Sequence, residues 1–185
     1  MIKTLVFIGG IARESINRKL FAYVEARNGG RFAFDVPALE TLPFFSQDIE
    51  DAPPAVVVDL RERMERADAL LVVTPEYNRS YPAVLKNALD WTSRPKHWGA
   101  GKPAAVLGAS RGPIGTFGAQ LLTRLLLGTL DFHVMTKPEI YFNHAQYVDA
   151  QGRLAEASGK IFDDFVDAFA AWATSRRGPT PLGKI

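Results

Sequence analysis

The chain has 185 residues, of which 47% are hydrophobic and 23% are charged, as in an ordinary globular domain. This composition excludes a disordered or fibrous protein. The 22 Lys and Arg against 20 Asp and Glu give a formal charge of +2, too balanced for a protein that mainly coats nucleic-acid phosphates, and the absence of cysteine excludes disulfides and thiolate metal sites.

The sequence shows neither a membrane span nor a secretory leader. No apolar run reaches the roughly 18 residues that a spanning helix needs, because Pro, Gly or a charge interrupts each one. The first residues, M-I-K-T-L-V-F-I-G-G, lack the basic start and the cleavage site of a signal peptide. We therefore expect a cytoplasmic protein with no membrane or nucleic-acid partner.

Apolar runs of β type alternate with helical patterns along the whole chain. The apolar runs predict strands at 3–8, 31–36, 69–73, 104–107 and 132–141, the last broken by Lys137-Pro138. Helical spacing and proline or glycine ends predict helices at 15–27, 53–66, 82–92, 118–127 and 157–175. The segment 37–52 is expected to be a long irregular connection.

This alternation predicts one α/β domain over residues 1–175 with a doubly wound, five-stranded parallel sheet and helices on both faces. Five strands favour the flavodoxin-like order 2-1-3-4-5, in which ligands bind beyond the carboxyl ends of the strands. The loops after the first, third and fourth strands should therefore carry function. Residues 176–185 have the composition of a disordered tail, and we expect them to form an intersubunit arm.

The loop after the first strand reads G-G-I-A-R-E-S-I-N, residues 9–17. Free N–H groups at the start of a helix, with Ser15, Asn17 and Arg13 beside them, are typical of an anion site. A capped turn with a solvated arginine explains the same residues equally well. The loop matches neither G-x-x-x-x-G-K-[ST] nor G-x-G-x-x-G, so it does not support a kinase, a GTPase or a standard dinucleotide fold.

The loops after the third and fourth strands are also unusual. Residues 74–81 read T-P-E-Y-N-R-S-Y, which suits a planar heteroaromatic ligand with polar edges, although the tyrosines can instead serve packing. Residues 108–115 read G-A-S-R-G-P-I-G, so that backbone can approach a ligand closely. We interpret Arg111 in this loop as a solvated side chain.

The stretch T-P-E-Y-N-R-S-Y-P-A-V-L-K-N-A-L-D-W, residues 74–91, resembles the signature of the NAD(P)H-dependent FMN reductase family. That family includes quinone, chromate, ferric and azo-dye reductases. The first loop, G-K-P-A-A-V-L-G-A-S and G-A-Q also match, so the resemblance extends to about Trp172. It implies a flavodoxin-like fold, FMN as cofactor, NADPH or NADH as co-substrate, ping-pong transfer to a small-molecule acceptor, and a homodimer or homotetramer.

The resemblance assigns the FMN phosphate to the first loop and the flavin ring to the two later loops, with no side chain assigned as catalytic. The implied cofactor-binding residues are Gly10, Arg13, Ser15, Ile16, Asn17, Pro75, Glu76, Tyr77, Asn78, Ser80, Ala109 and Ser110. The family's first loop usually reads G-S-x-R-x-x-S-x-N, whereas this chain has Gly10 and Ala12 at the Ser and Arg positions. We expect Arg13 to supply the phosphate cation instead.

Histidines, one charged pair and four aromatic residues outside the three loops also suggest roles. The histidines His97, His133 and His144 lack metal-ligand spacing, so no metal site is expected. Arg124 and Glu139 stand where relatives carry an intersubunit charged pair. Four aromatic residues are interface, pocket or core candidates: Phe44, Phe45, Trp91 and Trp98.

Three alternative functions stay open at this stage. An enzyme of the same class can release reduced FMN as a diffusible product, which the altered first loop favours. A one-electron carrier like flavodoxin shares the fold, but such carriers are typically acidic and carry T-x-T-G-x-T. A receiver-type regulatory domain needs acidic residues after the first strand and a phosphoacceptor Asp after the third, where this chain has Gly-Gly and Pro-Glu-Tyr.

Overall fold

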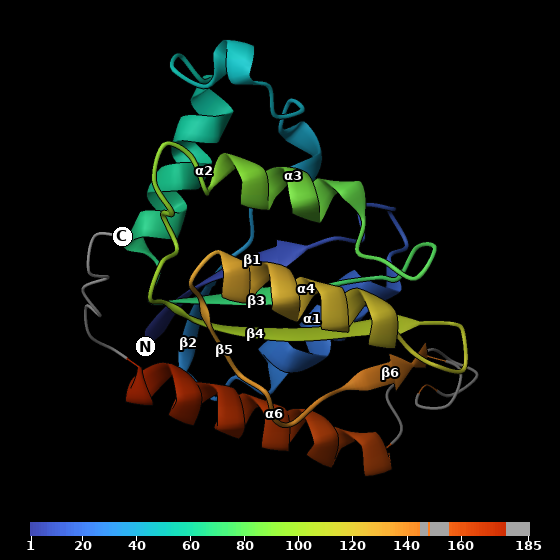
Figure 1. Ribbon diagram of the computed structural model, residues 1–185. Coiled ribbons are helices and arrows are strands. Elements are labelled where there is room, and N and C mark those ends of the chain that lie inside the picture. The colour runs from blue at the N-terminus through green and yellow to red at the C-terminus, as the bar shows by residue number, and fades with distance from the viewer. Residues whose placement is uncertain (145–147, 149–155, 177–185) are drawn as a thin grey trace.

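The computed structural model describes residues 1–144, 148 and 156–176 (Figure 1). Its strands are β1 (Ile2–Ile8), β2 (Phe32–Asp35), β3 (Ala69–Val73), β4 (Pro103–Ser110), β5 (His133–Val134) and β6 (Tyr141–Asn143). Its helices are α1 (Ile16–Ala26), α2 (Ala55–Arg66), α3 (Ala83–Trp91), α4 (Phe117–Thr129) and α6 (Glu156–Ser175), with short 3-10 turns η1 (Leu39–Thr41) and η2 (Gln47–Ile49). Of the predicted tail, 176–185, only Arg176 belongs to the described residues, so the predicted intersubunit arm lies outside them.

The strands form a parallel sheet in the order β2-β1-β3-β4-β5, which confirms the predicted flavodoxin-like topology. Strand β3 is central because it is a continuous apolar run, A-L-L-V-V, whose residues are all buried. A strand covered by helices on both faces has no polar side, so it shows no alternation.

Successive residues of β1 point into two separate cores. Val6 and Ile8 pack with α1 and α6 on one face of the sheet, whereas Leu5 and Phe7 pack with α2, α3 and α4 on the other. Figure 1 shows α6 running along one side of the sheet and α3 along the other. This alternation follows the two-residue period of a strand. Among the described helices, none has the length and apolar character to cross a membrane.

The last predicted strand, 132–141, is wrong in its extent. The structure has two short strands there, β5 and β6, and both pair in parallel with β4 at different points along it. Lys137 and Pro138 lie between them, at the break that the sequence indicated. Proline has no N–H for a strand ladder, and β6 begins only at Tyr141, where the predicted strand ends.

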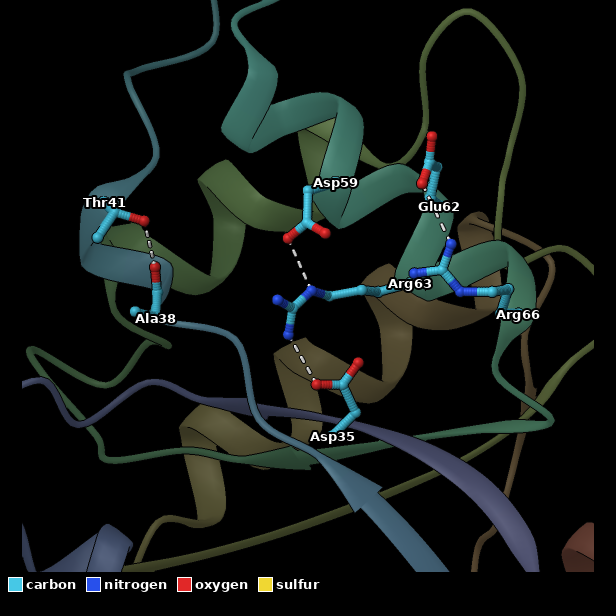
Figure 2. A network of polar contacts seen from close by, with 7 residues as sticks. All are labelled: Asp35, Ala38, Thr41, Asp59, Glu62, Arg63 and Arg66. Atoms are coloured by element: carbon cyan, nitrogen blue, oxygen red, sulfur yellow. Dashed lines mark hydrogen bonds and ion pairs between the residues drawn. The ribbon is translucent and has the colours of Figure 1, made fainter.

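Helix α2 is tied to the edge strand β2 by one arginine (Figure 2). Arg63 Nε donates to Asp59 Oδ2 at 2.7 Å, and its Nη1 donates to Asp35 Oδ1 at 2.7 Å. Lys102 contacts the C-terminal end of α2: its Nζ donates to the carbonyl oxygens of Glu65 and Ala67 at 2.9 and 2.6 Å. Both contacts hold α2 against the sheet.

The connection between β2 and α2 is held by helix α3. Asn87 Nδ2 and Trp91 Nε1 both donate to the Pro43 carbonyl, at 2.9 and 2.8 Å, and Asn87 Oδ1 accepts from Phe45 N at 2.8 Å. Trp91 is a core residue, and Phe45 packs edge-on against its ring. Phe44 is left 81% exposed.

Candidate functional site

A cavity of about 260 Å³ lies where β1, β3 and β4 end, at the edge of the sheet that the topology predicted. Its lining comes from the three loops after these strands. The lining residues are Gly10, Ala12, Glu14, Ser15, Ile16, Asn17, Pro75, Glu76, Tyr77, Ala109, Ser110 and Arg111.

Helix α1 begins at the cavity. Ser15 is its N-cap: the side-chain oxygen accepts a hydrogen bond from Arg18 N at 3.4 Å. The N–H groups of Ile16 and Asn17, in the first turn, have no preceding helical carbonyl to bond. Both residues line the cavity, so the positive end of the helix dipole is directed at it. This arrangement suits an anion.

Asn17 joins α1 to β4 beneath the cavity. The side chain is 1% exposed, and its Nδ2 donates to Ala109 O at 3.0 Å while its Oδ1 accepts from Ala109 N at 2.9 Å. The Asn17 amide therefore makes the two backbone hydrogen bonds at Ala109 that a neighbouring strand would otherwise make. Its role is to position the first loop against the third one.

Gly10 is required by the packing of Ser15. A Cβ at Gly10 would overlap Ser15 Oγ, and it would also lie 3.4 Å from Asn17 Cβ. The family's usual serine at this position is therefore incompatible with the present rotamer of Ser15. The glycine at position 10 and the conformation of Ser15 thus depend on each other.

The second wall of the cavity follows β3. Thr74 Oγ1 donates to Pro75 O at 2.8 Å, and Pro75 is buried. Glu76 bonds to the start of α4: its Oε2 accepts from Ala119 N at 3.0 Å, in the first turn of that helix. Tyr77 remains 54% exposed at the rim. The carboxylate thus stabilises the helix N-terminus and fixes the loop.

The third wall is a loop closed by Ser110. Its Oγ donates to Gly115 O at 2.6 Å and accepts from Gly112 N at 3.2 Å. The end of β4, from which the loop starts, lies close to the segment after β3, because a Cβ at Gly108 would overlap Thr74 O. A second hollow of about 400 Å³ adjoins the cavity and shares Glu76, Ser110 and Arg111 with it.

Most of the predicted cofactor-binding residues are brought together. Arg13, Asn78 and Ser80 do not line the cavity, and Arg13 is exposed on the first loop. Arg111 is exposed, as the sequence predicted, and it also lies at the rim of the cavity. Its position directly after Ser110, in a glycine-rich loop, is the signal that places it there.

His144 lies just beyond β6, near this cationic edge. Burial lowers the pKa of the His144 imidazole, and the positive charges of Arg111 and Lys19 lower it further. The neutral form is therefore favoured in the fold.

Within the part of the chain that the structure describes, no three His, Asp or Glu side chains are grouped as metal ligands.

Comparisons with known proteins agree with this geometry. The family model described as NADPH-dependent FMN reductase matches residues 2–147. A 2-hydroxy-1,4-benzoquinone reductase from a Burkholderia species is 41% identical over 182 residues, covering 95% of this chain and 98% of that protein. An NAD(P)H-dependent FMN reductase from Pseudomonas aeruginosa is 38% identical over 182 residues, covering 96% and 98%.

Among solved structures, the NAD(P)H:acceptor oxidoreductase FerB from Paracoccus denitrificans superposes with a TM-score of 0.89 at 37% identity. The match covers 95% of this chain and 99% of that one. The chain therefore belongs to the NADPH-dependent FMN reductase family. The predicted class, an NAD(P)H-dependent oxidoreductase that uses FMN, is confirmed, and these matches support neither a flavodoxin-like carrier nor a receiver domain.

Proposed function

We propose that this protein binds FMN in the cavity described above and uses it to reduce a small quinone with NADH or NADPH. The observation that carries this proposal is the convergence of three loops, each with a different chemical character, on one cavity at the carboxyl edge of the sheet. When bound, FMN supplies the chemistry, accepting hydride from the nicotinamide and passing two electrons to the acceptor.

The cavity fits the parts of FMN. The helical N–H groups of Ile16 and Asn17, with the dipole of α1, suit the phosphate dianion. The buried Pro75 and the half-exposed Tyr77 offer a flat wall for the ring, opposite Ala109 and Ser110. The side-chain amide of Asn17 is already paired with Ala109, so we expect Asn17 to contribute its backbone N–H and not its side chain.

Glu76 lines the cavity, but its carboxylate is engaged by other groups of the protein. One Glu76 oxygen accepts from Ala119 N, and the other lies 3.5 Å from Arg79 Nη1. Both carboxylate oxygens are therefore engaged, one by the start of α4 and the other by the turn after β3. Glu76 therefore positions the loop, and the protons that the acceptor takes up come from solvent.

A small quinone fits an open face next to the ring, and a relative with 41% identity is named for 2-hydroxy-1,4-benzoquinone reduction. The test is steady-state reduction of 1,4-benzoquinone with NADH and NADPH in the presence of FMN. Double-reciprocal plots at several quinone concentrations should give parallel lines, because nucleotide and quinone use the same face in turn. Intersecting lines, or no turnover, would contradict the proposal.

A second candidate function of the same class treats FMN as a diffusible substrate. The first loop favours it, because Gly10 and Ala12 lack the family's two polar side chains and Arg13 does not line the cavity. A dissociation constant above about 10 μM, with turnover that saturates in added FMN, would support it over the bound-cofactor form. Stable retention of FMN would exclude it.

We also propose that the protein self-associates through helix α4. Phe117, Leu121 and Leu125 form one stripe with spacing of four residues and are 47%, 55% and 68% exposed. Beside them, Arg124 Nε is buried without a hydrogen-bond partner in the described chain, and Glu139 forms an ion pair with Lys137. A stripe along one helix is complementary to itself about a two-fold axis. Leu125→Lys should shift the mass in light scattering toward the monomer, and an unchanged mass would contradict this interface.

A further inference from the structure

The loop after β3 contains a tight turn with an unusual residue in it. Tyr77 N donates to Ser80 O at 2.9 Å, and Ser80 N donates to Tyr77 O at 3.0 Å. The two central residues, Asn78 and Arg79, have φ of 52° and 65°, which defines a mirror-image turn of type I′. Asn is tolerated there, but the second position favours glycine, and an arginine is strained.

The turn is fixed from below by helix α4. Glu76, just before the turn, accepts from Ala119 N, and a Cβ placed on Gly118 would come within 2.9 Å of the Arg79 carbonyl oxygen. The backbone of Arg79 is therefore held against the first turn of α4. The chain keeps an unfavourable residue at a rigid position, where glycine would serve the backbone better. Strain of this kind points to a role for the side chain.

The Arg79 side chain lies at the hollow next to the proposed flavin cavity. It is 73% exposed, and Glu76, the partner 3.5 Å away, is shared with the helix N-terminus. The loop 110–115, with the exposed Arg111, lines the same hollow. Arg79 and Arg111 thus both line a space of about 400 Å³ that shares Glu76, Ser110 and Arg111 with the cavity.

We propose that Arg79, with Arg111, binds the phosphate groups of the nicotinamide dinucleotide. The proposal rests on the proposed binding of FMN in the adjoining cavity. A nucleotide whose nicotinamide reaches the flavin ring must leave its phosphates outside the cavity, and the adjoining hollow is where two arginines stand. Guanidinium groups pair with phosphate oxygens in a fork, which lysine cannot reproduce. Arg79 is thus a determinant of nucleotide affinity.

The decisive variant is Arg79→Gly, which removes the charge and also relieves the left-handed backbone. We expect KM for NADH and NADPH to rise about five- to tenfold at low ionic strength, the loss of one charge-assisted contact at an exposed site. The melting temperature should stay the same or rise, because glycine favours this φ. A larger loss for NADPH than for NADH would place the contact at the 2′-phosphate, and an equal loss at the pyrophosphate.

Reduced nicotinamide riboside, which carries no phosphate, is the matched control substrate. Its kcat/KM should be equal in the wild type and in Arg79→Gly, and Arg79→Lys should recover only part of the nucleotide affinity. Arg66→Gln, on α2 and paired with Glu62, controls for the change in net charge. Unchanged KM for both nucleotides, or an equal loss with the riboside, would overturn the proposal.

These measurements distinguish an error in the role of Arg79 from an error in the binding of FMN. If the wild type binds FMN and turns over the riboside while Arg79→Gly behaves as wild type with NADPH, only the role of Arg79 is wrong. If the wild type does not bind FMN, the cavity assignment itself is wrong. A change in FMN affinity in Arg79→Gly would move Arg79 into the flavin site and would also overturn the proposal.

Discussion

Asn17 of α1 and Ala109 of β4 are joined by two hydrogen bonds across 92 residues of sequence. The pair fixes the start of α1 to the end of β4, so that the first and third loops of the cavity move together. Neither group reaches water, because Asn17 and Ala109 are each 1% exposed. The cavity wall is therefore built on a buried polar contact.

The first prediction concerns this contact. Asn17→Ala leaves the N–H and C=O of Ala109 without their partner, so unfolding free energy should fall by about 2–3 kcal/mol. FMN affinity should fall as well, because the two loops lose their common support. Urea unfolding followed by circular dichroism and a titration of FMN fluorescence measure the two effects.

Asn28 offers a matched control. Its Nδ2 donates to Phe32 O and its Oδ1 accepts from Phe32 N, both at 2.7 Å, far from the cavity lining. Asn28→Ala should lower stability without weakening FMN binding. Equal loss of FMN affinity in both variants would show that the Asn17 effect is one of general stability.

The second prediction concerns Gly10 and Ser15. Gly10→Ala places a Cβ on Ser15 Oγ, so Ser15 must leave the position from which it caps α1. We expect a loss of about 1–2 kcal/mol and weaker FMN binding. Gly10→Ser, although it restores the family residue, should behave like Gly10→Ala.

The coupling between these two residues gives the sharpest test. In a Ser15→Ala background the oxygen is gone, so adding Gly10→Ala should cost clearly less than it does in the wild type. A double-mutant cycle of unfolding free energies measures the difference. Additive losses would mean that Gly10 is required for a reason other than Ser15.

The third prediction separates positioning from proton transfer at Glu76. Glu76→Gln keeps an oxygen that can accept from Ala119 N, so quinone reduction should stay within about threefold of the wild type with an unchanged pH profile. Removal of a true general acid would cost about 100-fold or more. Glu76→Ala, which loses the contact, should lower stability by about 1 kcal/mol.

The fourth prediction concerns pH and His144. Because burial and the charges of Arg111 and Lys19 lower the pKa of His144, the unfolded chain binds a proton more readily than the folded one. Stability should therefore fall as pH decreases below the ordinary histidine pKa of about 6.5. Urea unfolding at pH 7.5 and 5.5 should show a smaller acid loss in His144→Gln than in the wild type.

The exposed His97 provides the control for this experiment. His97→Gln should keep the acid loss of the wild type. If His144→Gln shows the same dependence on pH as the wild type, then His144 does not contribute to acid sensitivity through burial.

The sequence predicted the sheet order and most of the site because the signals are local. The run A-L-L-V-V of β3 is continuous and apolar, and each candidate loop directly follows a strand. What it could not predict are contacts between distant segments, such as Glu76 with Ala119 and Asn17 with Ala109. The place of Arg111 in the cavity, in contrast to Arg13, depends on the course of a loop that no periodicity describes.

A visible spectrum shows whether the cavity holds FMN that passes hydride from NAD(P)H to an acceptor. Protein loaded with FMN is desalted and then titrated with NADH or NADPH without oxygen. We predict that the flavin bands survive desalting, are bleached by the nucleotide and return when 1,4-benzoquinone is added. A protein that shows no flavin bands after desalting and gains no nucleotide-dependent turnover from added FMN would not be an FMN-dependent reductase.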